Sequence, residues 1–167
     1  MTEGTKAKLD DLIAKFNTAM LVTQSLADEP RARPMAIAGH GDGSVLYFAT
    51  RSDDEKLQEL LKHPRVAVTM QADGYYLSIT GEARLQTDVL LAEELWSPDM
   101  RLWFPDGYRD TELTIIRVDP TYAEFWDRTG LRKLEFLWEA GKAVVRGEKA
   151  NDQSLQGHEK VRFDKPA

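Results

Sequence analysis

The sequence predicts a mainly β domain, an antiparallel sheet closed into a barrel with helices packed outside it. Pairs of apolar segments flank short turn sequences at residues 41–43 and 73–74, which is typical of β-hairpins. A parallel sheet requires helices that alternate with the strands. Here the helical patterns are few and do not alternate with the strands, which favours an antiparallel sheet. Periodicity alone does not separate a barrel from a sandwich, so a sandwich stays open at this point.

The chain begins with a predicted helix and then a hairpin. Four apolar residues at helical spacing should form the packed face of this helix: Leu9, Leu12, Ile13 and Phe16. Residues 26–33 read as a loop. The apolar segments on either side of it predict three strands, the last two paired through the turn at 41–43: residues 19–25, 34–40 and 45–50.

A short helix and a second hairpin should follow. Ser52 and Glu55 have the spacing of a capping box, and the helix ends before Pro64. Its apolar side is predicted to consist of Leu57, Leu60 and Leu61. Asp73 and Gly74 then lie between the two strands of the second hairpin, residues 65–71 and 75–86.

The next segment combines a helix, a loop and a long strand. Residues 87–96 suit a helix with Thr87 as its N-cap, and residues 97–110 are rich enough in Pro, Gly and Asp to form a loop. Residues 113–127 predict either one long strand or a pair of strands broken at Pro120.

The C-terminal part is predicted to be a helix and a polar tail. Apolar residues from Leu131 onward have helical spacing, whereas the last residues are polar and suit a loose tail. At 167 residues and 42% hydrophobic content, the chain is expected to form one domain. We assign residues 1–145 to this domain and residues 146–167 to the tail.

Composition excludes several classes of function. The chain has no cysteine, which excludes disulfides and thiolate metal sites and favours a reducing cytoplasm. Neither a signal peptide nor the ~20-residue apolar run of a membrane span is present, so we expect no membrane association. A formal charge of −6 opposes nucleic-acid binding. No metal site is expected, because three scattered histidines do not form a ligand motif: His40, His63 and His158.

One segment suits an anion. An apolar strand ends at Thr50 and runs directly into a capped helix, whose N-terminus is a natural phosphate site. Hydroxyl groups and positive charges cluster there: Thr50, Arg51, Ser52 and Lys56. In the alternative interpretation, Ser52 only caps the helix and the charged residues face water. The acidic neighbours Asp53, Asp54 and Glu55 favour that alternative.

The chain also resembles a known family between Phe16 and Trp126. Its segments RARPMAIAG, LYFAT, HPRVAVTM and YLSITGEARL occur in the order found in general stress proteins of the pyridoxamine 5′-phosphate oxidase-like group. The most distinctive part is LWSPDMRLWFPDG ahead of VDPTYAEFWD. The resemblance implies a six-stranded antiparallel split β-barrel that forms a homodimer, with FMN in clefts between the subunits.

The resemblance also implies which residues contact FMN. Those assigned to the isoalloxazine ring and its polar edge are Arg33, Pro34, Met35, Phe48 and Ala49. Those assigned to the phosphate are Thr50, Arg51, Ser52 and Lys56. Those assigned to the cover of the ring or to the other subunit are Ser78, Trp103 and Trp126. The alternatives are a packing role for the apolar residues and a surface ion pair for Arg33.

Two departures from the family pattern are visible. Asp54 stands where family members commonly have a serine, and the C-terminus lacks the arginine-rich segment of true pyridoxamine 5′-phosphate oxidases. We therefore do not expect that oxidase activity. The predicted function is an FMN-binding general stress protein. If it is an enzyme, we expect a flavin-dependent oxidoreductase, whose catalytic residues and substrate are unknown. The alternatives are a non-catalytic protein that sequesters flavin or another cofactor, and a structural dimer with an empty cleft.

Overall fold

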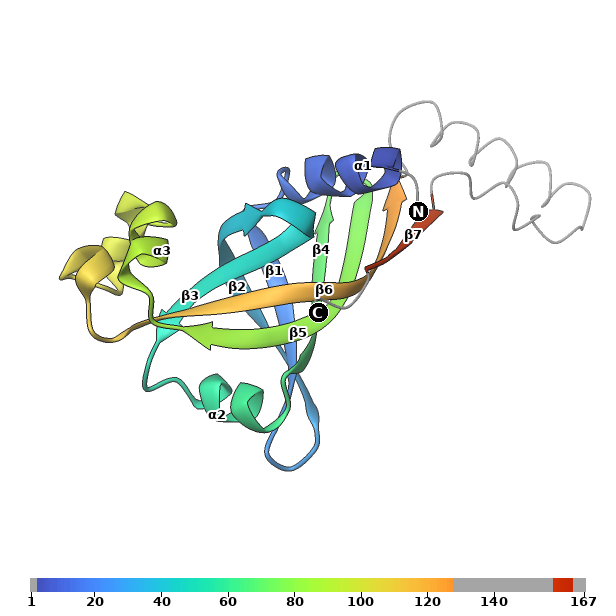
Figure 1. The fold of residues 1–167 in the computed structure, drawn as a ribbon. Helices are drawn as coiled ribbons and strands as arrows, with labels where there is room; N and C mark the ends of the chain where they lie inside the picture. Colours follow the sequence, from blue (N-terminus) through green and yellow to red (C-terminus); the bar gives the residue numbers. More distant parts are fainter. Residues whose placement is uncertain (1–2, 128–157, 164–167) are drawn as a thin grey trace, which may run out of the picture.

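An antiparallel sheet forms most of the molecule. The computed structural model describes residues 3–127 and 158–163. In these residues the strand order is β3-β2-β1-β4-β5-β6-β7, and β3 also pairs with β6 (Figure 1). The strand bounds are β1 Thr18–Gln24, β2 Pro30–Gly41, β3 Val45–Arg51, β4 Arg65–Ala72, β5 Tyr75–Gln86, β6 Leu113–Asp127 and β7 His158–Arg162.

The long strand β6 closes the barrel. One edge of β6 pairs with β5 from Ile115 to Asp127. The other edge pairs with β3 between Leu113 and Val118, and then with β7 from Tyr122 onward. The β3–β6 pairing joins the two ends of a six-stranded sheet, while β7 adds a strand beside it. The predicted six-stranded antiparallel barrel is confirmed, and the sandwich alternative is wrong.

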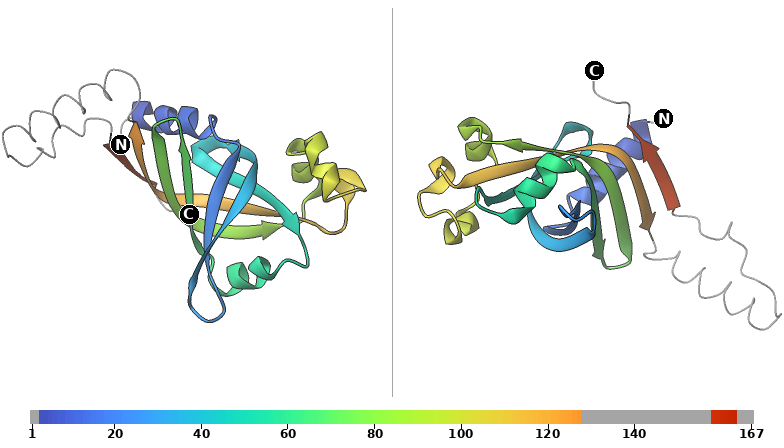
Figure 2. Two further views of the ribbon diagram at one scale, coloured as in Figure 1. Left: turned by 180° about the vertical axis from the view of Figure 1, so that it is seen from behind. Right: turned by 90° about the horizontal axis from the view of Figure 1, so that it is seen from below.

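Helices lie at the ends of this barrel, as Figures 1 and 2 show. The helix α1, Glu3–Ile13, covers one end, and three members of its predicted apolar face are confirmed because they are buried: Leu9, Leu12 and Ile13. Phe16 is also buried, but it lies after the helix ends. The helix α2, Glu55–Lys62, lies at the opposite end and buries Leu57 and Leu60 in the same core. Leu61 departs from the prediction: it is 67% exposed, whereas the nearby Glu59 is fully buried.

Both predicted helix caps are one or two residues too early. Asp54 caps α2, where its side chain accepts a hydrogen bond from the Lys56 N–H, so Ser52 is not the cap. Asp88 caps α3, Val89–Glu94, in place of Thr87. In each case an aspartate directly before the helix reaches the free N–H groups of the first turn.

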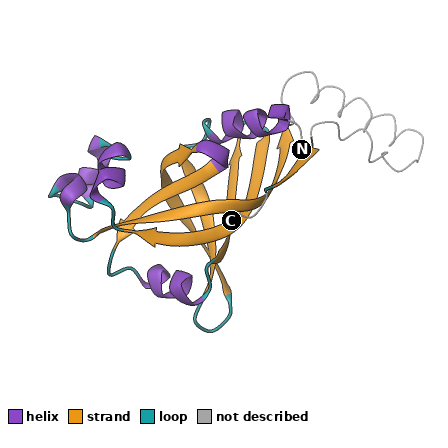
Figure 3. Ribbon diagram, viewed as in Figure 1, coloured by secondary structure: helices purple, strands orange, loops and turns teal. Residues whose placement is uncertain are grey.

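Two segments predicted as loops are ordered differently. β2 begins at Pro30, so residues 30–33 belong to a strand; proline is tolerated there because it is the first strand residue. Residues 97–110 contain two short 3-10 helices, η2 Pro98–Leu102 and η3 Gly107–Arg109, which lie beside α3 beyond one edge of the barrel (Figure 3). A third, η1 Asp42–Ser44, forms the turn between β2 and β3.

The predicted tail contains a strand. His158–Arg162 forms β7 and pairs with β6, so the expectation of a loose tail is wrong for these residues. The edge of β6 that β3 leaves unpaired supplies the backbone partners for β7. The helix predicted from Leu131 and the proposed boundary at 145/146 lie outside the described residues.

The bend of β6 depends on a glycine in β5. Pro120 does not break β6; it lies beside Gly81 at a bulge that leaves Thr121 unmatched. A Cβ at Gly81 would lie 2.5 Å from the Asp119 carbonyl oxygen. The two backbones therefore approach too closely for any other residue.

We expect Gly81→Ala to lower the free energy of unfolding by about 1–3 kcal/mol, because the added methyl group must push the β6 backbone away. Urea unfolding followed by tryptophan fluorescence measures this change. Gly4→Ala in α1 is the control, since no atom lies within 4 Å of its Cβ position. Equal stabilities for the two variants would contradict this account of the bulge.

Candidate functional site

A buried lysine lies where β3 passes into α2. Thr50 at the end of β3 and Lys56 in the first turn of α2 are 6% and 5% exposed. Lys56 Nζ donates a hydrogen bond to Thr50 Oγ1 at 2.9 Å and forms an ion pair with the Asp54 carboxylate. Because a buried ammonium group is costly without partners, these two contacts account for its position.

The Asp54 carboxylate accepts hydrogen bonds from three groups of this turn. Its Oδ1 accepts from the Lys56 backbone N–H at 3.0 Å, and its Oδ2 accepts from Thr50 Oγ1 at 3.3 Å and from Lys56 Nζ. Burial raises the pKa of Asp54, but the hydrogen bonds from Lys56 and Thr50 outweigh burial and leave the pKa below its usual value. Asp54 is therefore a charged partner of Lys56.

Arg51 and the Ser52 backbone have partners other than Lys56 and Asp54. The Arg51 guanidinium contacts both oxygens of Asp53 at 3.1 Å and Glu112 at 2.7 Å. The hydrogen bond and charge of Asp53, followed by the charge of Glu112, raise the pKa of Arg51. The Ser52 N–H donates to the Glu112 carbonyl oxygen at 2.7 Å. The cation predicted beside Lys56 is thus already paired with two carboxylates.

A cavity of about 680 Å³ opens beside this turn, with β2 and η2 forming other parts of its wall. It brings together seven of the predicted cofactor residues: Pro34, Met35, Ala49, Thr50, Arg51, Lys56 and Trp103. Trp103 is 56% exposed. The cavity wall is mixed: apolar side chains line part of it, and polar groups cluster at Thr50, Asp54 and Lys56.

Three predicted residues from this part of the chain do not line the cavity: Arg33, Phe48 and Ser52. Arg33 donates to the carboxylate of Glu59 at 2.8 Å, as in the ion-pair alternative, although Glu59 is buried. The Phe48 side chain is fully buried in the barrel core, and its strand pairs with β2 on one side and β6 on the other. The backbone role assigned to Phe48 stays a prediction.

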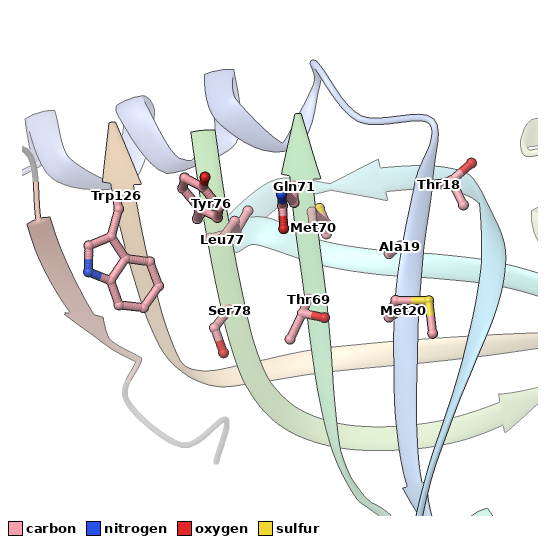
Figure 4. Close-up of a pocket in the computed structure, with 10 residues that line it drawn as sticks. All are labelled: Thr18, Ala19, Met20, Thr69, Met70, Gln71, Tyr76, Leu77, Ser78 and Trp126. Atoms are coloured by element: carbon pink, nitrogen blue, oxygen red, sulfur yellow. The ribbon is translucent and has the colours of Figure 1, made fainter. Parts of the chain in front are cut away.

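Ser78 and Trp126 lie in a second hollow, of about 450 Å³, on β1, β4, β5 and β6 (Figure 4). The Trp126 indole stacks on the His158 ring with centroids 4.8 Å apart, and His158 Nε2 lies 2.6 Å from Glu124 Oε1. Thr18 is the only described residue that lines both hollows. Within one chain, Ser78 and Trp126 therefore do not join the residues around Lys56.

A family model described as pyridoxamine 5′-phosphate oxidase like matches residues 4–151 of the chain. The chain belongs to this family. The predicted resemblance is thus confirmed for most of the sequence, including the β3–α2 turn and η2. No curated protein matches the chain.

Solved structures from the family share the fold. A general stress FMN/FAD binding protein from Xanthomonas citri is 26% identical, with a TM-score of 0.66 over 77% of this chain and 92% of its own. General stress protein 26 from Bacillus anthracis is 25% identical, with a TM-score of 0.66 over 72% and 92%. A putative general stress protein 26 from Jannaschia is 20% identical, with a TM-score of 0.73 over 97% and 100%.

Sequence reasoning missed part of the cavity wall. Met100 and Phe104 line the cavity from η2 and the turn after it, and Ala36 and Ala38 line it from β2. Phe104 is only 3% exposed. The available signal in the sequence was a large apolar residue within a segment rich in Pro, Gly and Asp. In the described part of the chain, no helix is long and apolar enough to cross a membrane, and no cluster of His, Asp and Glu could hold a metal ion.

Proposed function

We propose that this family member binds FMN in the cavity beside Lys56. The observation that carries the proposal is that one cavity is lined both by Lys56 and Thr50 and by a set of apolar residues that includes Met35. Flavin mononucleotide has the matching chemistry, a flat aromatic ring and a phosphate. The volume of about 680 Å³ lies within the usual range for small-ligand sites. The Xanthomonas citri relative is described as an FMN/FAD binding protein, which supports the same ligand class.

Different residues around the cavity would bind the ring and the phosphate of FMN. Pro34, Met35 and the backbone at Ala49 would orient the ring, while Lys56 and Thr50 would bind the phosphate. Trp103 would cover part of the ring and leave the rest of the cavity rim open. When bound, FMN supplies electron transfer, so the protein needs to provide position and electrostatics only.

A homodimer is part of this proposal. The exposed side chains that line the hollow at Ser78 and Trp126 are uncharged: Thr18, Met20, Thr69, Gln71 and Tyr76. Depletion of charge is typical of the core of a protein interface. A second copy seated on this face would bring Ser78 and Trp126 toward a flavin held by its partner. Analytical ultracentrifugation should show a dimer, and a charge introduced by Met20→Asp should shift it toward monomer.

Titration of the purified protein with FMN, followed by quenching of flavin fluorescence, tests the binding proposal. Saturation at one FMN per chain is expected. Trp103→Ala should bind FMN more weakly without losing the fold. A protein that takes up no flavin at any concentration would sink the proposal.

A second measurement separates an oxidoreductase from a protein that sequesters flavin. We favour the oxidoreductase because Trp103 is more than half exposed, which leaves the cavity rim open to a second small molecule. Reduction of bound FMN by a nicotinamide cofactor and reoxidation by an added acceptor would support it. Binding with no reduction by any donor tested would favour sequestration.

A further inference from the structure

We propose that Asp54 sets the ligand selectivity of the cavity. Its carboxylate occupies the hydrogen-bond donors that a phosphate group needs, so the site distinguishes little between FMN and unphosphorylated riboflavin. This inference rests on the proposed flavin site, and it concerns the polar groups of the cavity rather than the ring.

The donors among these groups already have an anionic partner. Lys56 Nζ, the Lys56 backbone N–H and the Thr50 hydroxyl all contact Asp54. Thr50, Asp54 and Lys56 all line the cavity where β3 passes into α2. A carboxylate and a phosphate accept the same kind of charge-assisted hydrogen bond. An incoming phosphate must therefore compete with Asp54 for the Lys56 N–H and the Thr50 hydroxyl, and must share the Lys56 ammonium group with it.

The local charge balance gives the phosphate no advantage. The charges of Lys56 and Asp54 cancel within one ion pair. Arg51 is shared between Asp53 and Glu112. Asp99 of η2 adds a further negative charge to the cavity wall. Among the described residues that line this cavity, Lys56 and Arg51 are each already paired with a carboxylate, so a phosphate that carries about −1.5 to −2 charges must share them.

Asp54 is also held in place by the helix. Because its Oδ1 caps α2, turning the side chain away would leave the Lys56 N–H without its acceptor. The carboxylate is thus a fixed part of the site, and flavin affinity should come mainly from the ring.

Asp54→Asn tests the inference. Asparagine has the same shape and is an equally good N-cap, so α2 should be retained while the negative charge is lost. We expect FMN to bind this variant about tenfold or more tightly than the wild type, because a charged competitor for the phosphate is removed. Riboflavin should change by less than about twofold, since it has no phosphate. Asp54→Ser, which also retains the cap, should behave in the same way.

Asp88→Asn is the matched control. Asp88 caps α3 as Asp54 caps α2, and the substitution changes the net charge equally. It lies outside the lining of the flavin cavity, so the ratio of FMN to riboflavin affinity should stay at the wild-type value.

Other outcomes separate this inference from the proposed function. If the wild type and Asp54→Asn bind FMN equally, the inference is wrong while flavin binding stands. A wild type that already prefers FMN over riboflavin by about a hundredfold would overturn it as well. If neither flavin binds any variant, the flavin proposal fails, and titration with inorganic phosphate decides the role of Asp54. A phosphate-dependent shift of the Lys56 amide resonance in Asp54→Asn but not in wild type supports it; no shift in either overturns it.

Discussion

Glu59→Gln is expected to lower the free energy of unfolding by about 3–5 kcal/mol, the usual cost of removing one charge from a buried ion pair. Glu59 is fully buried. Its carboxylate accepts from Thr23 Oγ1 at 2.6 Å and from Arg33 at 2.8 Å, and it pairs with Arg31 at 3.3 Å. Since the Arg33 side chain is only 23% exposed, loss of Glu59 leaves a partly buried cation without its partner.

Urea unfolding followed by tryptophan fluorescence measures this effect. Glu55→Gln is the control, because Glu55 contacts the same Arg31 from the same helix but is 71% exposed. We expect the control to change stability by less than about 1 kcal/mol, as for other surface ion pairs. Similar losses for Glu55→Gln and Glu59→Gln would show that burial of the pair is not the cause.

The same carboxylate should make stability depend on pH. Burial raises the pKa of Glu59, but hydrogen bonds from Thr23 and Arg33 outweigh burial, so the pKa in the folded protein is below the ordinary value of 4.5. A lowered pKa means that the contribution is complete above the unfolded-state pKa and is lost as pH falls through the folded-state pKa. The difference in unfolding free energy between wild type and Glu59→Gln should therefore be constant near neutral pH and shrink below about pH 4.5. If this difference in unfolding free energy instead grew as the pH falls, the lowered pKa of Glu59 would be contradicted.

Lys56→Met is expected to weaken FMN binding by about a hundredfold while riboflavin binding changes little. The substitution removes the buried cation that lines the cavity and keeps a side chain of similar length. Asp54 then faces the FMN phosphate without its partner, so the like charges repel each other. The effect should exceed that of any other single change in the cavity.

Parallel titrations with FMN and riboflavin measure this effect. Lys62→Met is the control: it removes the same charge from the same helix, but Lys62 is 47% exposed and its Nζ contacts Leu26 and Asp28. A Lys56→Met variant that loses both flavins equally would indicate a general loss of structure. If the Lys56→Met variant keeps full FMN affinity, the phosphate does not bind beside Lys56.

Local sequence patterns determined most of the elements. Alternation of apolar residues located both hairpins, and Asp73 and Gly74 adopt the positive φ angles that their turn requires, at 46° and 86°. Spacing alone also identified the buried face of α1. The family resemblance then predicted seven residues that line the cavity. They lie on strands and turns that the neighbouring sequence determines, so matching these segments to the family pattern was enough to find them.

Tertiary structure decided what these patterns could not. Periodicity placed Leu61 inside and gave no reason to bury Glu59, but the partners of Glu59 come from β1 and β2, far away in the sequence. The β3–β6 pairing closed the barrel and left the edge on which β7 pairs. At the β3–α2 turn, the sequence showed that Asp54 lies between Thr50 and Lys56. Only the fold showed that its carboxylate is the group that their donors bind, because burial of Lys56 forces the nearest anion to serve as its partner.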